Sequence, residues 1–164
     1  MLTLFILSFG ILSRIVVHTP NFTPVLALAL FGGMYLKGRQ GIWVPLVLMA
    51  ISDVVLGWHD TMVYTWGSIL LISLMGLWLK EHKSWVNVAL GSLLSSVVFF
   101  VITNFGAYLS LYPHTLAGLQ ECYIAAIPFY RSTLVSTLAY SLVLFSIWEI
   151  LLSRRENPFL MKML

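Results

Sequence analysis

The sequence predicts an all-α, polytopic membrane protein, a single integral membrane domain over residues 1–164 folded as a bundle of six transmembrane helices. Three observations predict this fold. Hydrophobic residues make up 60% of the chain and charged residues only 9%, whereas a soluble domain carries roughly 25% charged residues. The mean hydropathy is +0.95. Apolar runs of about spanning length recur along the chain, separated by short polar or turn-forming segments.

Six apolar runs predict the helices, at residues 2–18, 23–36, 41–57, 61–79, 84–111 and 131–153. A helix needs roughly 17–25 apolar residues to cross the hydrocarbon core. The first run has neither a basic start nor a small-residue cleavage site, so we expect a retained helix rather than a signal peptide. The second run is short for a span, but its small residues Ala27, Ala29, Gly32 and Gly33 favour close helix packing.

The third run carries Asp53 about one turn before the Gly57-Trp58 pair that ends it. The fourth run ends at the polar segment KEHK. The fifth run is longer than a span requires, and the segment after it, YPHTLAGLQECYIAAIPFYR, is interpreted as a long loop. The sixth run begins at Arg131, directly after that loop.

Cations gather on one side of this predicted bundle. Seven of the nine Lys and Arg residues follow the second, fourth and sixth runs, namely Lys37, Arg39, Lys80, Lys83, Arg154, Arg155 and Lys162. The positive-inside rule therefore places both termini in the cytoplasm. We expect a multi-pass protein of the bacterial inner (cytoplasmic) membrane, in contact with the lipid bilayer. No basic stripe suited to nucleic acid is present.

The opposite face carries aromatic and hydrogen-bonding residues in place of cations. Apolar walls with a few convergent polar groups are typical of small-molecule sites, so we interpret this face as a substrate-binding site. Its candidate residues are Asn21, Phe22, Asp53, Trp58, His59, Tyr64, Asn104, Tyr112, His114, Glu121, Tyr123 and Arg131. The alternative is that they are ordinary interfacial aromatic belts and helix caps.

Asp53 is the most informative of these residues, because an aspartate at the centre of a membrane helix costs about 2.5–3.5 kcal/mol on insertion scales. Its short side chain should face the bundle interior or a wet cavity. There it either fixes a substrate donor or pairs with a cation, such as Arg131 or Arg14, in a structural clamp. Arg131 can itself bind a carboxylate or phosphate through two hydrogen bonds. Asn104 either reads a ligand or joins two helices.

A metal or haem site is a second hypothesis for the same face. His18, His59 and His114 lie in three different predicted loops, and Cys122 can supply a soft thiolate ligand. No H-x-x-x-H or H-E-x-x-H spacing occurs, so these residues can converge only through the tertiary structure. The alternative is that the histidines are solvated loop residues and Cys122 is a small apolar filler.

Three segments resemble an uncharacterised bacterial membrane family that is similar to the substrate-binding S components of energy-coupling-factor (ECF) vitamin transporters. They are NFTPVLALALFGGMYL, PLVLMAISDVVLG and TNFGAYLSLYPHTLAGLQECYIAAIPFYRSTLVSTLAYSLVLF, which cover most of residues 20–145. Within them, TNFG, YP-x-TLAG-L and AAIPF-x-R carry the resemblance.

The resemblance implies a six-helix bundle that captures a vitamin, a vitamin precursor or a metal ion near its outer face. Loops between helices one and two, three and four, and five and six would close over it. In this sequence they are NFTP, GWHD and YPHTLAGLQECYIAAIPFY. The resemblance also implies an ECF-type partner module, with two ATPase subunits and a scaffold membrane protein. Some S components, including a cobalamin-type group, occur without a dedicated partner.

One departure concerns that partner. S components usually present A-x-x-x-A on helix one to dock the scaffold subunit, and MLTLFILSFGILSRIVV has no such pair, which counts against the coupling. We expect binding and uptake of a vitamin, a precursor or a similar small molecule, with a cobalamin-like compound as one candidate. No G-x-S-x-G motif or catalytic triad is found, so we expect no enzyme and no cofactor. The remaining alternative is an assembly subunit without a ligand.

Overall fold

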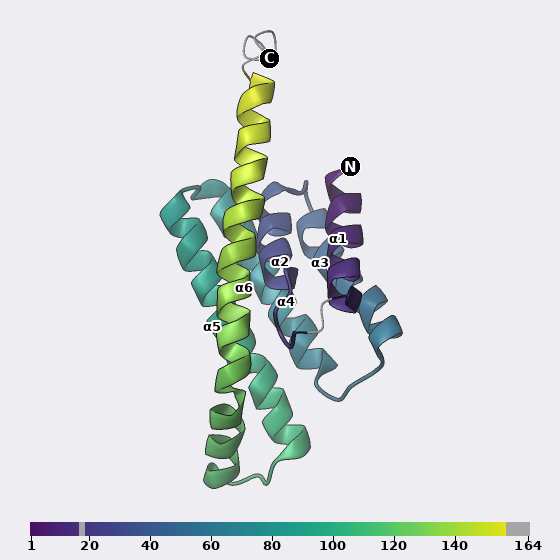
Figure 1. The fold of residues 1–164 in the computed structure, drawn as a ribbon, viewed down its shortest axis with the longest axis vertical. Helices are drawn as coiled ribbons and strands as arrows, with labels where there is room; N and C mark the ends of the chain where they lie inside the picture. Colours follow the sequence, from purple (N-terminus) through teal and green to yellow (C-terminus); the bar gives the residue numbers. More distant parts are fainter. Residues whose placement is uncertain (17–18, 157–164) are drawn as a thin grey trace.

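The computed structural model describes residues 1–16 and 19–156, which form six α-helices (Figure 1). The helices are α1 (Leu2–Val16), α2 (Val25–Tyr35), α3 (Gln40–Leu56), α4 (Met62–Glu81), α5 (Trp85–Leu111) and α6 (Leu116–Glu156). The all-helical prediction is confirmed, and the bounds of the first five helices lie within two residues of the predicted runs.

The predicted long loop between the fifth and sixth helices is wrong. Only residues 112–115 connect α5 to α6, and α6 continues as one helix of 41 residues with Pro128 inside it. A proline disfavours helical backbone at the preceding residue, but here packing against α5 overrides that preference. The Tyr123 hydroxyl donates to the carbonyl of Val101 at 2.7 Å, and the ring of Phe100 lies 4.9 Å from that of Tyr130.

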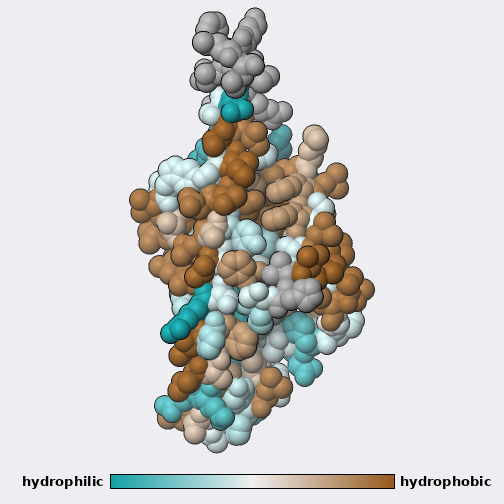
Figure 2. Space-filling view, viewed as in Figure 1, coloured by the Kyte–Doolittle hydropathy of each residue, from teal (hydrophilic) through white to brown (hydrophobic). Residues whose placement is uncertain are grey.

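Three of the six helices are long and apolar enough to cross a membrane. They are α4, α5 and the Leu116–Arg154 part of α6. The helices α1, α2 and α3 are apolar but shorter, with 15, 11 and 17 residues. Apolar side chains cover the flanks of the molecule in Figure 2, and examples are Leu12, Val54 and Leu142, each more than half exposed. Such a surface fits lipid better than water.

The helix α2 occupies the centre of the bundle, and every residue from 25 to 34 is buried. It crosses α4 at two glycines that allow the backbones to touch. A Cβ atom on Gly76 would lie 2.2 Å from the Leu30 carbonyl oxygen, and one on Gly33 would lie 2.2 Å from the Ser73 carbonyl oxygen. Gly41 at the start of α3 approaches the same place, because its Cβ would lie 3.1 Å from the Gly33 Cα.

The bundle has two chemically different ends. The start of α1 and the last turns of α6 lie at one end, together with the α2–α3 and α4–α5 connections (Figure 1). Those connections carry the cations Lys37, Arg39 and Lys83. We call this the terminal end. The α3–α4 and α5–α6 connections lie at the opposite end, which we call the cavity end for the site described next.

Candidate substrate cavity

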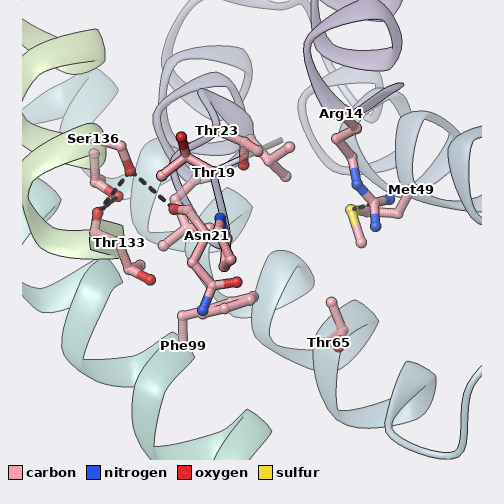
Figure 3. Close-up of a pocket in the computed structure, with 13 residues that line it drawn as sticks. Arg14, Thr19, Asn21, Thr23, Met49, Thr65, Phe99, Thr133 and Ser136 are labelled. Atoms are coloured by element: carbon pink, nitrogen blue, oxygen red, sulfur yellow. Dashed lines mark hydrogen bonds between the residues drawn. The ribbon is translucent and has the colours of Figure 1, made fainter. Parts of the chain in front are cut away.

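A polar cavity of about 230 Å³ lies toward the cavity end, where all six helices or their connections contribute to its wall (Figure 3). The connection from α1 to α2 forms one side, with exposed Thr19, Pro20 and Asn21. The remaining described lining residues are Arg14, Thr23, Val25, Leu26, Met49, Thr65, Phe99, Thr133, Ser136 and Thr137. The wall therefore combines hydroxyl groups and one guanidinium with a few apolar and aromatic surfaces.

The α6 wall presents a stripe of three buried hydroxyls, Thr133, Ser136 and Thr137. Residues three and four apart share one face of a helix, so all three reach the same cavity. The Thr133 hydroxyl donates to the Phe129 carbonyl at 3.0 Å, and the Thr137 hydroxyl donates to the Thr133 carbonyl at 2.7 Å. Ser136 donates to the carbonyls of Thr133 and Asn21 (Figure 3). Their protons are engaged, so these hydroxyls can offer an occupant only acceptor lone pairs.

Close packing of α1 on α3 brings Arg14 to the opposite wall. A Cβ atom on Gly10 would lie 2.0 Å from a methyl carbon of Leu48, so the glycine leaves room for the leucine in its present rotamer. One turn further along both helices, the guanidinium of Arg14 donates through Nη1 to the Ser52 hydroxyl. The same nitrogen lies 3.3 Å from the Met49 sulfur.

Arg14 forms a buried ion pair with Asp53, which sits behind it. Its Nη2 lies 2.7 Å from Asp53 Oδ1, and the two side chains are 15% and 1% exposed. The indole Nε1 of Trp66, on α4, donates to Asp53 Oδ2 at 2.7 Å. Oδ2 thus accepts a hydrogen bond, whereas Oδ1 has the counter-charge of Arg14 beside it but no hydrogen bond in the described part of the chain. A counter-charge is what a carboxylate in an apolar interior requires most.

Comparison with protein-family models finds a match over residues 1–160 to a family described as a family of unknown function, DUF6580. The chain belongs to the DUF6580 family. No curated protein and no solved structure matches it. DUF6580 membership assigns no chemistry, so the function of this chain has to be argued from the cavity.

The structure of this DUF6580 member gathers only part of the predicted site around the cavity. Asn21 lines the cavity, and Asp53 lies behind the wall, paired with the lining residue Arg14. Phe22 packs on Tyr140 with ring centroids 6.0 Å apart. Tyr64 lies instead against α5, where its ring covers Gly106.

The other predicted residues of the DUF6580 chain lie away from the cavity wall. Trp58 is 77% exposed in the α3–α4 connection, and the His59 imidazole lies 2.9 Å from the neighbouring Thr61 hydroxyl. The Asn104 amide donates to its own helix at Phe100. The remaining residues lie on the α5–α6 hairpin, and are the half-buried Tyr112 and Tyr123 and the exposed His114, Glu121 and Arg131. Arg131 is therefore not the partner of Asp53.

The proposed metal ligands do not form a cluster in the described part of the chain. No group of three or more His, Cys, Asp or Glu residues is placed to hold an ion there. His114 contacts the Leu109 carbonyl, and the Cys122 thiol contacts the Asn104 carbonyl at 3.3 Å between α6 and α5. His18 lies outside the described residues.

Sequence reasoning missed most of the cavity wall. The α6 stripe has a detectable signal in RSTLVST, because its hydroxyl residues recur at helical spacing inside an otherwise apolar run. Thr65 and Phe99 carry no such signal. They reach the cavity because α4 and α5 pack around α2, an arrangement that no local pattern encodes.

Proposed function

We propose that this DUF6580 member is a membrane substrate-binding protein, similar to an S component, that captures a small molecule for uptake. The observation that supports this most strongly is that the described wall of one cavity gathers six hydroxyl side chains, one amide and one guanidinium. Buried polar groups are costly unless they are satisfied. A cavity wall rich in acceptors is therefore best explained by a polar occupant.

The volume of the cavity limits the size of that occupant. An apolar cavity of about 150 Å³ holds one benzene molecule, so about 230 Å³ suits a single substituted ring or a compound of similar size. This favours a vitamin precursor or another small metabolite over an intact cobalamin. The missing A-x-x-x-A pair on α1 favours action without the ECF-type ATPase module and scaffold.

The proposal places the cavity end at the outer face of a bacterial inner membrane and the terminal end in the cytoplasm. The support is the cations in the terminal-end connections, which the positive-inside rule assigns to the cytoplasm. In this arrangement all six helices enter the bilayer. The helices α1, α2 and α3 cover only part of its thickness, and the 41-residue α6 extends beyond it.

Native mass spectrometry of gently purified protein tests the binding function directly. We expect a co-purifying small molecule, with retention reduced in a Thr133→Val/Thr137→Val variant. Each hydroxyl contact is worth about 1 kcal/mol, so both losses together should weaken binding more than tenfold.

Thr103→Val is the matched control, because the Thr103 hydroxyl makes the same intrahelical bond, to the Phe99 carbonyl at 2.7 Å, without lining the cavity. Equal retention by all three proteins, or no bound molecule in any of them, would contradict the proposal.

Cysteine labelling tests the orientation. In a Cys122→Ser background, a cysteine replacing Lys83 should react only from the cytoplasm, and one replacing Asp60 only from outside. Both positions are exposed, so lack of access does not complicate the result. The reverse pattern would invert the proposed direction of uptake.

A further inference from the structure

The charges on the cavity wall indicate which class of substrate the cavity can bind. Among the described lining residues, Arg14 carries the only formal charge, and the others are hydroxyl, amide or apolar side chains. The carboxylate of Asp53 lies 2.7 Å from the guanidinium but does not itself line the cavity. The pair is neutral as a whole, and only its cationic member meets the cavity.

An anionic occupant would disturb this pair. An anion that reaches the free N–H groups of Arg14 meets a guanidinium whose charge Asp53 already neutralises, so it gains little to offset its own desolvation. To bind Arg14 more strongly, it would have to draw the guanidinium away from Asp53. The carboxylate would then remain buried, at 1% exposure, with the Trp66 indole as its remaining described partner. A buried charge without its counter-charge is strongly destabilising. A cationic occupant meets the opposite difficulty, since Arg14 stands between the cavity and Asp53.

The hydrogen-bonding character of the two walls is also unequal. The Thr133, Ser136 and Thr137 oxygens are acceptors, because their protons are bonded to carbonyls. The Arg14 side offers only N–H donors. A fitting molecule therefore brings N–H or O–H groups to α6 and a neutral acceptor, such as a carbonyl oxygen, to Arg14.

We infer that Asp53 is a specificity-determining residue, which neutralises Arg14 so that the cavity takes an uncharged, hydrogen-bonding small molecule and rejects anions. The inference rests on the proposed function, because it names the substrate class of the same cavity. In this role Asp53 affects the ligand through Arg14 and does not contact the ligand itself.

Rescue by a small carboxylate tests this role. Asp53→Asn leaves the guanidinium without its counter-charge, so acetate should enter the cavity and replace it. We expect acetate to raise the unfolding midpoint of the variant saturably and to recover at least half of the loss. Acetamide, its uncharged isostere, should not. In both titrations the ionic strength is held constant with the salt of a sulfonate that is too bulky to enter the cavity.

Three proteins serve as controls. Wild type should show no saturable shift with acetate, because Asp53 already neutralises Arg14. Asp60→Asn removes an exposed carboxylate and should behave like wild type. Arg14→Gln/Asp53→Asn removes both charges and should not respond to acetate.

If Asp53→Asn is too unstable to purify alone, the readout becomes its yield of monodisperse protein when extracted with acetate or with acetamide. A higher yield with acetate supports the role. Equal yields, or a saturable stabilisation of wild type by acetate, would overturn it. These outcomes are independent of whether a molecule co-purifies. A co-purified molecule carrying a net charge would refute the charge specificity while leaving the binding function intact.

Discussion

Among the described residues, each end of the bundle holds one ion pair, and the two pairs have very different surroundings. At the cavity end, Arg14 and Asp53 are 15% and 1% exposed. At the terminal end, Lys83 and Glu149 are 45% and 29% exposed. Glu149 also accepts a hydrogen bond from the Tyr35 hydroxyl, and the Lys83 ammonium lies 5.7 Å from the centre of the Tyr35 ring.

The comparison shows that the same chemical pair has a different energetic role in each place. An exposed pair gains little, because water and salt screen its attraction and its side chains lose freedom. A buried pair need not stabilise the fold relative to apolar residues, but breaking it leaves a charge that the interior cannot solvate. We therefore expect the cavity end to be sensitive to charge and the terminal end to depend on steric packing.

The largest effect should come from breaking the buried pair. Asp53→Asn should lower the free energy of unfolding by about 3–5 kcal/mol, because it strands the Arg14 charge. Equilibrium unfolding in detergent measures this. A double-mutant cycle with Arg14→Gln should show strong coupling, and a cycle with exposed Arg131→Gln should show none. Coupling to Arg131 instead would contradict the pairing seen here.

The second partner of Asp53 should have the next largest effect. Trp66→Phe removes the indole N–H from a buried carboxylate and should cost about 1.5–3 kcal/mol, as expected for a hydrogen bond to a charged group. The terminal-end counterpart is Tyr35→Phe, which removes the hydroxyl that donates to Glu149. Water reaches Glu149 and can replace that hydroxyl, so the measured cost should be smaller. Equal losses of stability in Trp66→Phe and Tyr35→Phe would contradict the expectation that burial makes the hydrogen bond to Asp53 more stabilising.

A steric substitution should affect the helix crossing that supports the terminal end. Gly76→Ala places a methyl group 2.2 Å from the Leu30 carbonyl oxygen, so α2 and α4 must separate, at a cost of about 1–3 kcal/mol. Gly67→Ala, in the same helix, meets nothing within 4 Å and should stabilise by roughly 0.5–1 kcal/mol. Thermal unfolding midpoints distinguish the two variants by the sign of the shift.

The smallest effect should come from the exposed pair. Lys83→Gln should change the free energy of unfolding by about 0–1 kcal/mol, and the difference should disappear at high salt, where screening is complete over a few ångströms. Unfolding curves at low and high sodium chloride measure this. A loss as large as that of Asp53→Asn would abolish the distinction between the two ends.

The helices could be predicted because lipid-compatible helices require long apolar runs, and the breakers between them are strong. The segment 112–130 was the exception, because its polar and turn-forming residues, Pro128 among them, are a local signal for a loop, while the packing that keeps residues 116–130 helical comes from α5. The pairing of Asp53 was left between Arg14 and Arg131, because sequence spacing cannot tell which helix lies beside α3. The packing of α1 on α3, with Leu48 against Gly10, places Arg14 beside Asp53, and that contact is visible only in three dimensions.

The burial of α2 has a consequence for how the protein is made. Eleven residues rise about 16 Å, roughly half of the hydrocarbon thickness, and the helix has almost no surface left for lipid. A nascent segment of this length cannot be held in the bilayer as an independent span. In the proposed membrane arrangement we expect it to enter the bundle as later helices are inserted, when Gly76 of α4 becomes available to pack against it. We therefore expect assembly of this chain to be ordered in time, with the central helix placed only after its neighbours are available to enclose it.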